Sequence, residues 1–94
     1  MRKSEPTAEE IARTVQFRAI RDTLTRAGWS AVRLASAIDA SPSSVLNWSA
    51  PPGSIQWRPV PVEKLEKLRM CGLEEARQSL VAIREMFPDV EDAA

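Results

Sequence analysis

The stretch LASAIDASPSSVLNWSAPPG, residues 34–53, contains two short apolar patterns separated by a small polar corner. Each pattern is about two helical turns long, and isolated helices shorter than about 12 residues are marginal in water. The two segments must therefore be held together by the rest of the fold. This requirement constrains the chain strongly, because its 94 residues provide room for one domain with one modest core.

The residues around the corner have the spacing of a helix-turn-helix. Ala35 supplies a small side chain where two helices would cross, and Asp39 stands at the corner, where aspartate tolerates a left-handed backbone. Val45 and Trp48 lie three residues apart and would anchor the second helix on the core. We therefore predict a helix-turn-helix over residues 30–49.

The rest of the chain is also predicted to be helical, with no convincing pair of strands. Prolines within SIQWRPVP, residues 54–61, exclude a helix there and predict an extended connection. Gly28 and Gly72 are expected to end helices, because glycine is the usual residue just after a helix. The expected fold is all-α with about five helices, over residues 7–28, 30–38, 41–49, 61–72 and 73–87.

The first helix carries two groups of apolar residues. Phe17, Ile20 and Leu24 follow one helical stripe, which is typical of a face packed on a core. Ile11 and Val15 fall almost on the opposite side at 100° per residue. Either the helix is broken in this part, or it carries a second apolar patch that would suit a partner chain.

The net charge of zero conceals an uneven distribution along the chain. Residues 11–69 contain nine basic and four acidic side chains, hence +5, whereas residues 70–94 contain two basic and six acidic ones, hence −4. A basic body with an acidic tail is compatible with a polyanion bound to the body. A solvated surface with a solubilising tail would have the same pattern.

Composition also excludes several classes of site. Cys71 is the only cysteine and the chain has no histidine, so an internal disulfide is impossible and a zinc site is not expected. Without histidine, a phosphate-binding glycine loop or a pair of carboxylates, we expect neither an enzyme nor a cofactor. No apolar run reaches the length of a membrane span and no leader precedes the fold, so we expect a cytoplasmic protein.

The segment LASAIDASPSSVLNW resembles the helix-turn-helix of the lambda-repressor and Cro superfamily, in its Leu-Ala start, its corner and its Val and Trp anchors. The later VPVEKLEKL is similar to the proline-led helix that follows in Cro-like phage regulators of the YdaS type. The resemblance covers residues 17–72. The chain departs from the family pattern with Asp39 in place of glycine, with no Gln or Arg on the second helix, and with a longer, proline-rich segment over residues 50–61.

The resemblance implies that the second short helix enters the major groove of DNA. If the two anchors point inward, three neighbouring side chains point outward, where an amide, a hydroxyl and an apolar group can meet base edges. Hydroxyls at the start of that helix and nearby cations would bind phosphates. We therefore expect Ser43, Leu46 and Asn47 at the bases, and Ser41, Ser44, Arg33, Arg58 and Lys64 at the phosphates.

One recognition helix reads few base pairs, so the resemblance also implies a homodimer on a symmetric operator. The last predicted helix offers a surface for it, a stripe with strict seven-residue spacing. The same stripe could instead cover the core of the body. The dimerisation candidates are Leu73, Ala76, Leu80, Ile83 and Phe87.

The sequence thus predicts three regions: a flexible segment over residues 1–10, a DNA-binding domain over residues 11–72, and a helix with an acidic tail over residues 73–94. The expected function is that of a sequence-specific transcriptional regulator, a Cro-like repressor of a phage or prophage. The alternative is a protein-interaction module on the same fold, such as an antitoxin that binds a toxin, a phage adaptor, or a DNA mimic that uses the acidic tail. The nearly uncharged second helix favours the alternative, and the basic body favours DNA.

Overall fold

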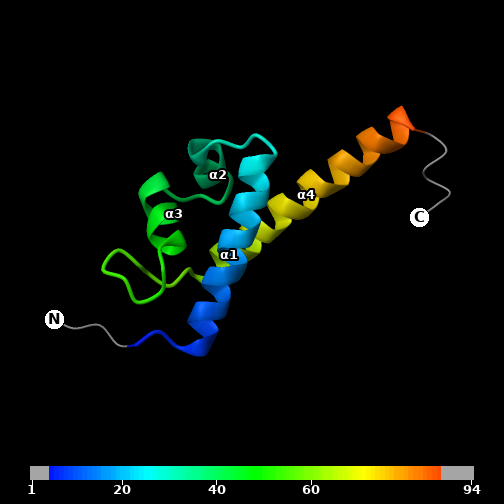
Figure 1. The fold of residues 1–94 in the computed structure, drawn as a ribbon. Coiled ribbons are helices and arrows are strands. Elements are labelled where there is room, and N and C mark those ends of the chain that lie inside the picture. The colour runs from blue at the N-terminus through cyan, green and yellow to red at the C-terminus, as the bar shows by residue number, and fades with distance from the viewer. Residues whose placement is uncertain (1–4, 88–94) are drawn as a thin grey trace.

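The computed structural model describes residues 5–87 of the chain, so the predicted acidic tail beyond Phe87 lies outside the described residues. The described part contains no strand, which confirms the all-α class. It contains four helices instead of the expected five (Figure 1): α1 (Ala8–Arg26), α2 (Ala31–Ala37), α3 (Pro42–Ser49) and α4 (Val62–Met86).

Helix α1 begins directly after Thr7, the first residue of the predicted helix, and a capping box holds this end. The Thr7 hydroxyl accepts a hydrogen bond from the Glu10 amide at 3.1 Å, and the Glu10 carboxylate accepts one from the Thr7 amide at 3.0 Å. The helix then continues without a break to Arg26. The exposed side chains of Ile11 and Val15 are therefore a second apolar patch on an intact helix, and the alternative of a local break is wrong.

The prediction of two helices separated at Gly72 is wrong, because α4 runs through this residue as one helix of 25 residues. Gly72 lies where α4 crosses α1, and a Cβ atom built on it would be 3.2 Å from Cγ2 of Ile20. Glycine here allows a close approach of two helices and does not end one. The predicted boundary between residues 72 and 73 consequently falls inside α4.

All four helices contribute to one small core. Phe17 and Leu24 of α1 are fully buried, and the ring of Phe17 meets that of Trp48 edge to face, with centroids 5.9 Å apart. The other members come from α2, α3, the 50–61 connection and the first half of α4: Leu34, Ala35, Ile38, Val45, Val60, Leu65 and Leu68.

The connection between α3 and α4 contains no helix, as its prolines predict, but its first part is not extended: the amides of Ser54 and Trp57 each donate a hydrogen bond to the carbonyl oxygen three residues before, at 3.1 Å, and close two turns. The connection is fixed to the body at two points. Trp57 is buried, and its indole Nε1 donates a hydrogen bond to the Thr14 hydroxyl at 3.1 Å. Nε of Arg13 donates one to the carbonyl oxygen of Val60 at 3.2 Å. Residues that are more than 40 positions apart in sequence therefore hold this segment against α1.

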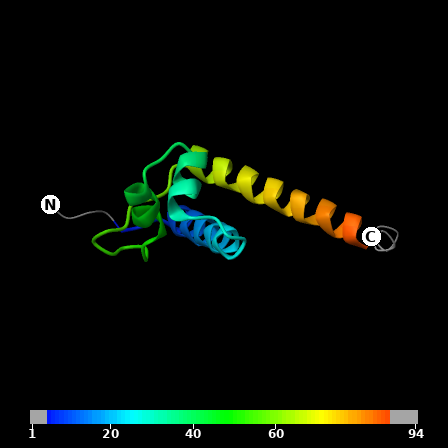
Figure 2. The ribbon, with the colours of Figure 1, turned by 90° about the horizontal axis from the view of Figure 1, so that it is seen from above.

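The second half of α4 extends away from the other helices, as Figure 2 shows from above. We call residues 73–87 the arm. Every arm residue beyond Glu75 is exposed, although the side chain of Glu75 still accepts a hydrogen bond from Trp29 Nε1 at 3.0 Å. The body of the fold therefore ends near the first turn of the arm.

Candidate nucleic-acid interface

Helices α2 and α3 meet at a corner with a left-handed residue. Asp39 has φ of 61° and is the one residue other than glycine with a positive φ in residues 5–87. Ile38 ends α2, and the amide of Ala40 donates a hydrogen bond back to the carbonyl oxygen of Ala35 at 2.9 Å. The predicted tolerance of aspartate for this backbone is confirmed at this position.

Lys64 of α4 binds the backbone of the same corner. Its Nζ donates hydrogen bonds to the carbonyl oxygens of Ile38 and Asp39 at 3.0 and 2.8 Å. A cation at the end of a helix satisfies carbonyl groups that have no partner within the helix. The Lys64 side chain is only 16% exposed, so the structure gives this predicted phosphate ligand a role in fixing α2 relative to α4.

Helix α3 presents the predicted residues on its outer side. Val45 is buried and Trp48 is half-buried, which leaves Ser43 exposed and Leu46 65% exposed. Asn47 is half-buried, and within residues 5–87 its side-chain amide has no hydrogen-bond partner. Its carbonyl oxygen accepts from the amide of Arg58 at 3.1 Å, which joins the end of α3 to the following segment.

Ser41 and Ser44 form the start of α3. The Ser41 hydroxyl accepts a hydrogen bond from the Ser44 amide at 3.1 Å and donates one to the Ser44 hydroxyl at the same distance. Both side chains therefore take part in helix capping. Pro42, at the first helical position, has no N–H group that would need an acceptor. The structure brings these two serines together with Ser43 at one end of α3.

Arg33 lies on the side of α2 that faces α4. Its guanidinium stacks on the indole of Trp29, with its Cζ atom 3.8 Å from the ring centroid. With Cys71 and Glu75 of α4, the pair lines a hollow between α2 and α4. The groove between α2 and α3 is lined by other residues, among them Val32, Ser36 and Pro42, and Arg33 does not take part in it.

Arg58 is held by its own loop. Its Nη1 donates hydrogen bonds to the carbonyl oxygens of Ile55 and Trp57 at 3.1 and 2.8 Å. A guanidinium has five N–H donors, so Arg58, which is exposed, retains donors for an anion.

The sequence analysis overlooked Ile55. This side chain is 92% exposed on a loop that the Arg58 hydrogen bonds and the buried Trp57 keep in place. The signal in the sequence is a β-branched apolar residue between serine and glutamine in a segment otherwise rich in proline and glycine. Together with Leu46, Ile55 gives this end of the body two exposed apolar groups.

Hydrogen bonds and burial shift the pKa values of several ionisable groups. The Arg21 guanidinium donates a hydrogen bond to Asp22 at 2.9 Å and holds the pKa of that carboxyl below its usual value. Hydrogen bonds from Arg77 and Gln78 lower the pKa of Glu74 in the same way. Burial raises the pKa of the Cys71 thiol, and the nearby charge of Arg33 partly opposes that shift.

Two classes of site find no support in the described residues. Over residues 5–87, no group of three or more metal-ligating side chains is placed so that it could hold a metal ion. None of the helices in the same range is both long enough and apolar enough to cross a membrane.

The predicted dimerisation residues lie together on the arm. Leu73, Leu80, Ile83 and Phe87 are each between 43% and 57% exposed, and Ala76 between them is exposed as well. The stripe therefore does not cover the core of the body, and that alternative is wrong. We call these five residues the arm stripe.

No protein-family model matches the chain, and no curated protein or solved structure is significantly similar to it. The function must therefore be argued from the residues and their arrangement.

Proposed function

We propose that this chain is a sequence-specific DNA-binding regulator, a Cro-like repressor of a phage or prophage, and that it binds operator DNA as a homodimer. In this proposal α2 and α3 form a helix-turn-helix, and α3 is the recognition helix that enters the major groove. The observation that carries the proposal is the side of α3 opposite the buried Val45, where Ser43 and Leu46 are exposed and Asn47 is half-buried.

The chemistry of these side chains suits base edges. The side-chain amide of Asn47 can donate a hydrogen bond to N7 of adenine and accept one from its exocyclic N6 amine, the pattern that adenine presents in the major groove. Leu46 can contact a thymine methyl group, and the hydroxyl of Ser43 can bond several bases. Because the Asn47 amide has no partner within residues 5–87, base contact does not require an internal hydrogen bond to break.

Phosphate contacts in this proposal come from the start of α3 and from Arg58. The N-terminal end of a helix attracts anions, and Ser41 and Ser44 lie at that end. Arg58 is joined to α3 through the carbonyl of Asn47 and retains free donors. Lys64 acts indirectly, because it fixes the corner that orients α3. Arg33 is exposed and stacked on Trp29, and its contact with a phosphate stays a prediction.

A second candidate function is a protein-interaction module, such as an antitoxin or a phage adaptor. The exposed apolar side chains of Leu46 and Ile55, beside an α3 without any charged residue, favour a protein surface as the partner. Both functions assign the same end of the body to the partner, and neither requires a cofactor or a catalytic step. A regulator would act in the cytoplasm, where its DNA is.

The test is selection of duplexes from a random-sequence library by the purified chain, followed by affinity measurements between about 50 and 200 mM salt. The proposal predicts an enriched motif with two-fold symmetry and an affinity that falls at least tenfold over this range. Absence of binding to any duplex at the lowest salt would contradict the regulator and leave the protein-interaction module as the better account.

A further inference from the structure

The arm stripe is an apolar surface that no residue within 5–87 covers. Residues 73–87 span about 21 Å at 1.5 Å per residue. The arm stripe runs along their full length, and Leu80 at its centre is 47% exposed. Figures 1 and 2 both show the arm projecting from the body, so another chain can reach the stripe without moving any described element.

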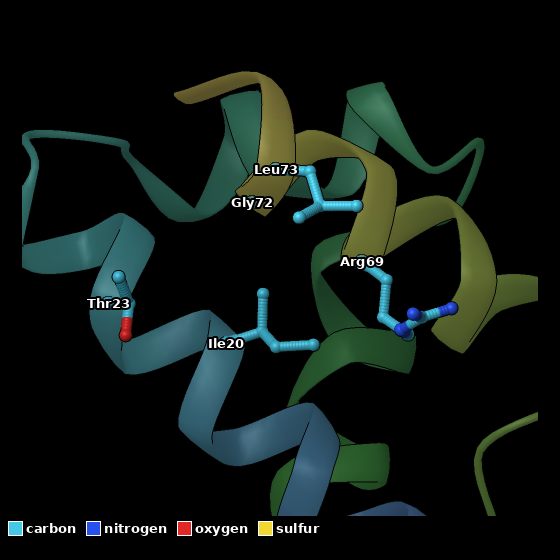
Figure 3. Close-up of a pocket in the computed structure, with 5 residues that line it drawn as sticks. All are labelled: Ile20, Thr23, Arg69, Gly72 and Leu73. Atoms are coloured by element: carbon cyan, nitrogen blue, oxygen red, sulfur yellow. The ribbon is translucent and has the colours of Figure 1, made fainter. Parts of the chain in front are cut away.

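A hollow continues the stripe onto the body. It lies between α1 and α4, has a volume of about 300 Å³, and we call it the α1–α4 notch. Figure 3 shows Ile20 of α1 and Leu73 of α4 pointing into it from opposite sides. Leu73 belongs both to the notch and to the arm stripe, so the two surfaces are continuous. The residues that line the notch are Ile20, Thr23, Arg69, Gly72 and Leu73.

We propose that a second copy of this chain covers both surfaces, with the two arms antiparallel and the end of each arm in the notch of the other copy. This inference rests on the homodimer of the proposed function and adds its geometry. The spacing of the stripe supports it, because Leu73 and Phe87 lie seven residues on either side of Leu80. In an antiparallel pair, Leu80 meets the partner's Leu80, and Leu73 meets the partner's Phe87.

Side-chain sizes along one edge of the stripe fit the same arrangement. This edge, the Gly72 edge, consists of Gly72, Ser79 and Met86, each directly before a stripe residue. In an antiparallel pair the edge faces itself, so Ser79 meets the partner's Ser79 and Gly72 meets the partner's Met86. Met86 is 68% exposed, and a flexible thioether side chain is suited to fill an irregular apolar hollow. Gly72 and Ile20 both line that hollow.

The charges at the base of the arm disfavour parallel arms. The stripe positions before Leu73 are occupied by Glu66 and Arg69, which form an ion pair within one chain at 2.6 Å. Parallel arms would bring Arg69 against the partner's Arg69 and would press the two bodies together at the same end. They would also turn the Gly72 edge toward the partner's Arg77, a cation instead of an apolar group.

Antiparallel arms place the opposite edge of the stripe, Arg77 and Arg84, against its copy. Each Arg77 is already neutralised by Glu74, with contacts of 2.6 and 3.2 Å, and the Glu74 carboxylate lies about one turn from the level of the partner's Arg84. The carboxylate can therefore pair with both arginines. Glu74 offsets the repulsion between the arginines of this edge, so the apolar contacts of the arm stripe determine the orientation of the two arms.

Cysteine cross-linking of the full chain tests the orientation. In a Cys71→Ser background, Leu80→Cys, Leu73→Cys and Phe87→Cys are introduced one at a time, and disulfides are scored on non-reducing gels after mild oxidation. Bridges form only where Cα atoms come within about 7 Å. We expect Leu80→Cys to cross-link alone, and Leu73→Cys to cross-link only when mixed with Phe87→Cys. Efficient cross-linking of Leu73→Cys with itself would overturn the antiparallel arrangement.

Sedimentation of two methionine variants tests the notch. Met86→Ala should weaken the dimer at least fivefold, whereas Met70→Ala, which removes a similarly exposed methionine that precedes the arm on the opposite edge from Met86, should leave it unchanged. Equal effects of the two changes, or a wild-type chain that is monomeric at about 100 μM, would overturn the proposal. Neither experiment contains DNA, so a chain that dimerises in this way without binding duplexes would contradict the proposed function alone.

Discussion

The ammonium group of Lys64 lies 2.8 Å from the carbonyl oxygen of Asp39, the residue whose φ of 61° turns the chain from α2 into α3. A second hydrogen bond reaches the carbonyl of Ile38 at 3.0 Å. These contacts fasten the corner to the first turn of α4. The direction of α3 therefore depends on a side chain that is distant in sequence and has no contact with α3 itself.

Replacing Lys64 with methionine should loosen this corner. Lys64→Met keeps the apolar stem and removes both hydrogen bonds, so we expect the free energy of unfolding to fall by about 1–2 kcal/mol. Lys67→Met is the matched control, because Lys67 lies 3.9 Å from the Asp39 carboxylate in an exposed ion pair and loses the same charge. Urea unfolding of the two variants checks the prediction, and equal midpoints would contradict the assigned role of Lys64.

The backbone at Asp39 predicts an order of stability. Glycine adopts a positive φ freely, whereas alanine is strained there by about 1 kcal/mol. Asp39→Ala should therefore be about 1 kcal/mol less stable than Asp39→Gly, and both changes remove the same carboxylate. Thermal unfolding at one pH measures the difference. If alanine proves as stable as glycine, the left-handed corner is not present in solution.

The hydrogen bond between Thr14 and Trp57 predicts a cost for removing one hydroxyl. Thr14→Val keeps the shape of a fully buried side chain and removes the acceptor of the indole N–H, so we expect a loss of about 1 kcal/mol. Thr23→Val is the control, because the Thr23 side chain is exposed. Its hydroxyl donates a hydrogen bond to the carbonyl oxygen of Ala19, four residues earlier, as the Thr14 hydroxyl does to that of Glu10. The control should change stability by less than about 0.5 kcal/mol.

The raised pKa of Cys71 predicts slow alkylation. Thiolate is the reactive form, and burial disfavours it in the folded chain, so iodoacetamide should react more slowly with folded than with urea-unfolded protein at pH 8. Arg33→Ala removes the cation that opposes the shift and should slow the reaction further. The pKa of the Cys71 thiol is higher in the folded than in the unfolded chain. Its contribution to the free energy of unfolding is therefore fully present below the unfolded pKa and declines as the pH rises through the folded pKa. An alkylation rate that is the same in both states would contradict the packing of Cys71.

The local features of the fold could be predicted from the sequence because each depends on neighbouring residues. The capping box of Thr7 and Glu10, the serine caps of α2 and α3, and the inward side of Val45 follow from short-range spacing. The all-α class follows from the same patterns. The outward position of Leu46 needs only the period of a helix and one known anchor.

Features that depend on contacts between distant segments could not be predicted. A glycine inside a helix and a glycine after one look alike in sequence, and only the position of Ile20 shows why Gly72 lies within α4. A sequence does not show which backbone carbonyl or indole ring a long cation meets, so the partners of Lys64, Arg33 and Arg58 within the fold could not be predicted. The hydrogen bonds of Lys64 and the stacking of Arg33 on Trp29 are properties of the packed fold.

In the proposed function, α3 reads bases through Asn47. The most direct measurement compares the affinity of wild type and Asn47→Ala for the selected site and for an unrelated duplex, with Gln16→Ala, an exposed amide on α1, as the control. The account predicts that Asn47→Ala loses about 1–3 kcal/mol at the selected site and almost nothing on unrelated DNA, since no charge is removed. Gln16→Ala should leave both affinities unchanged. If Asn47→Ala binds the selected site as tightly as wild type, α3 is not the reading helix and the claim is wrong.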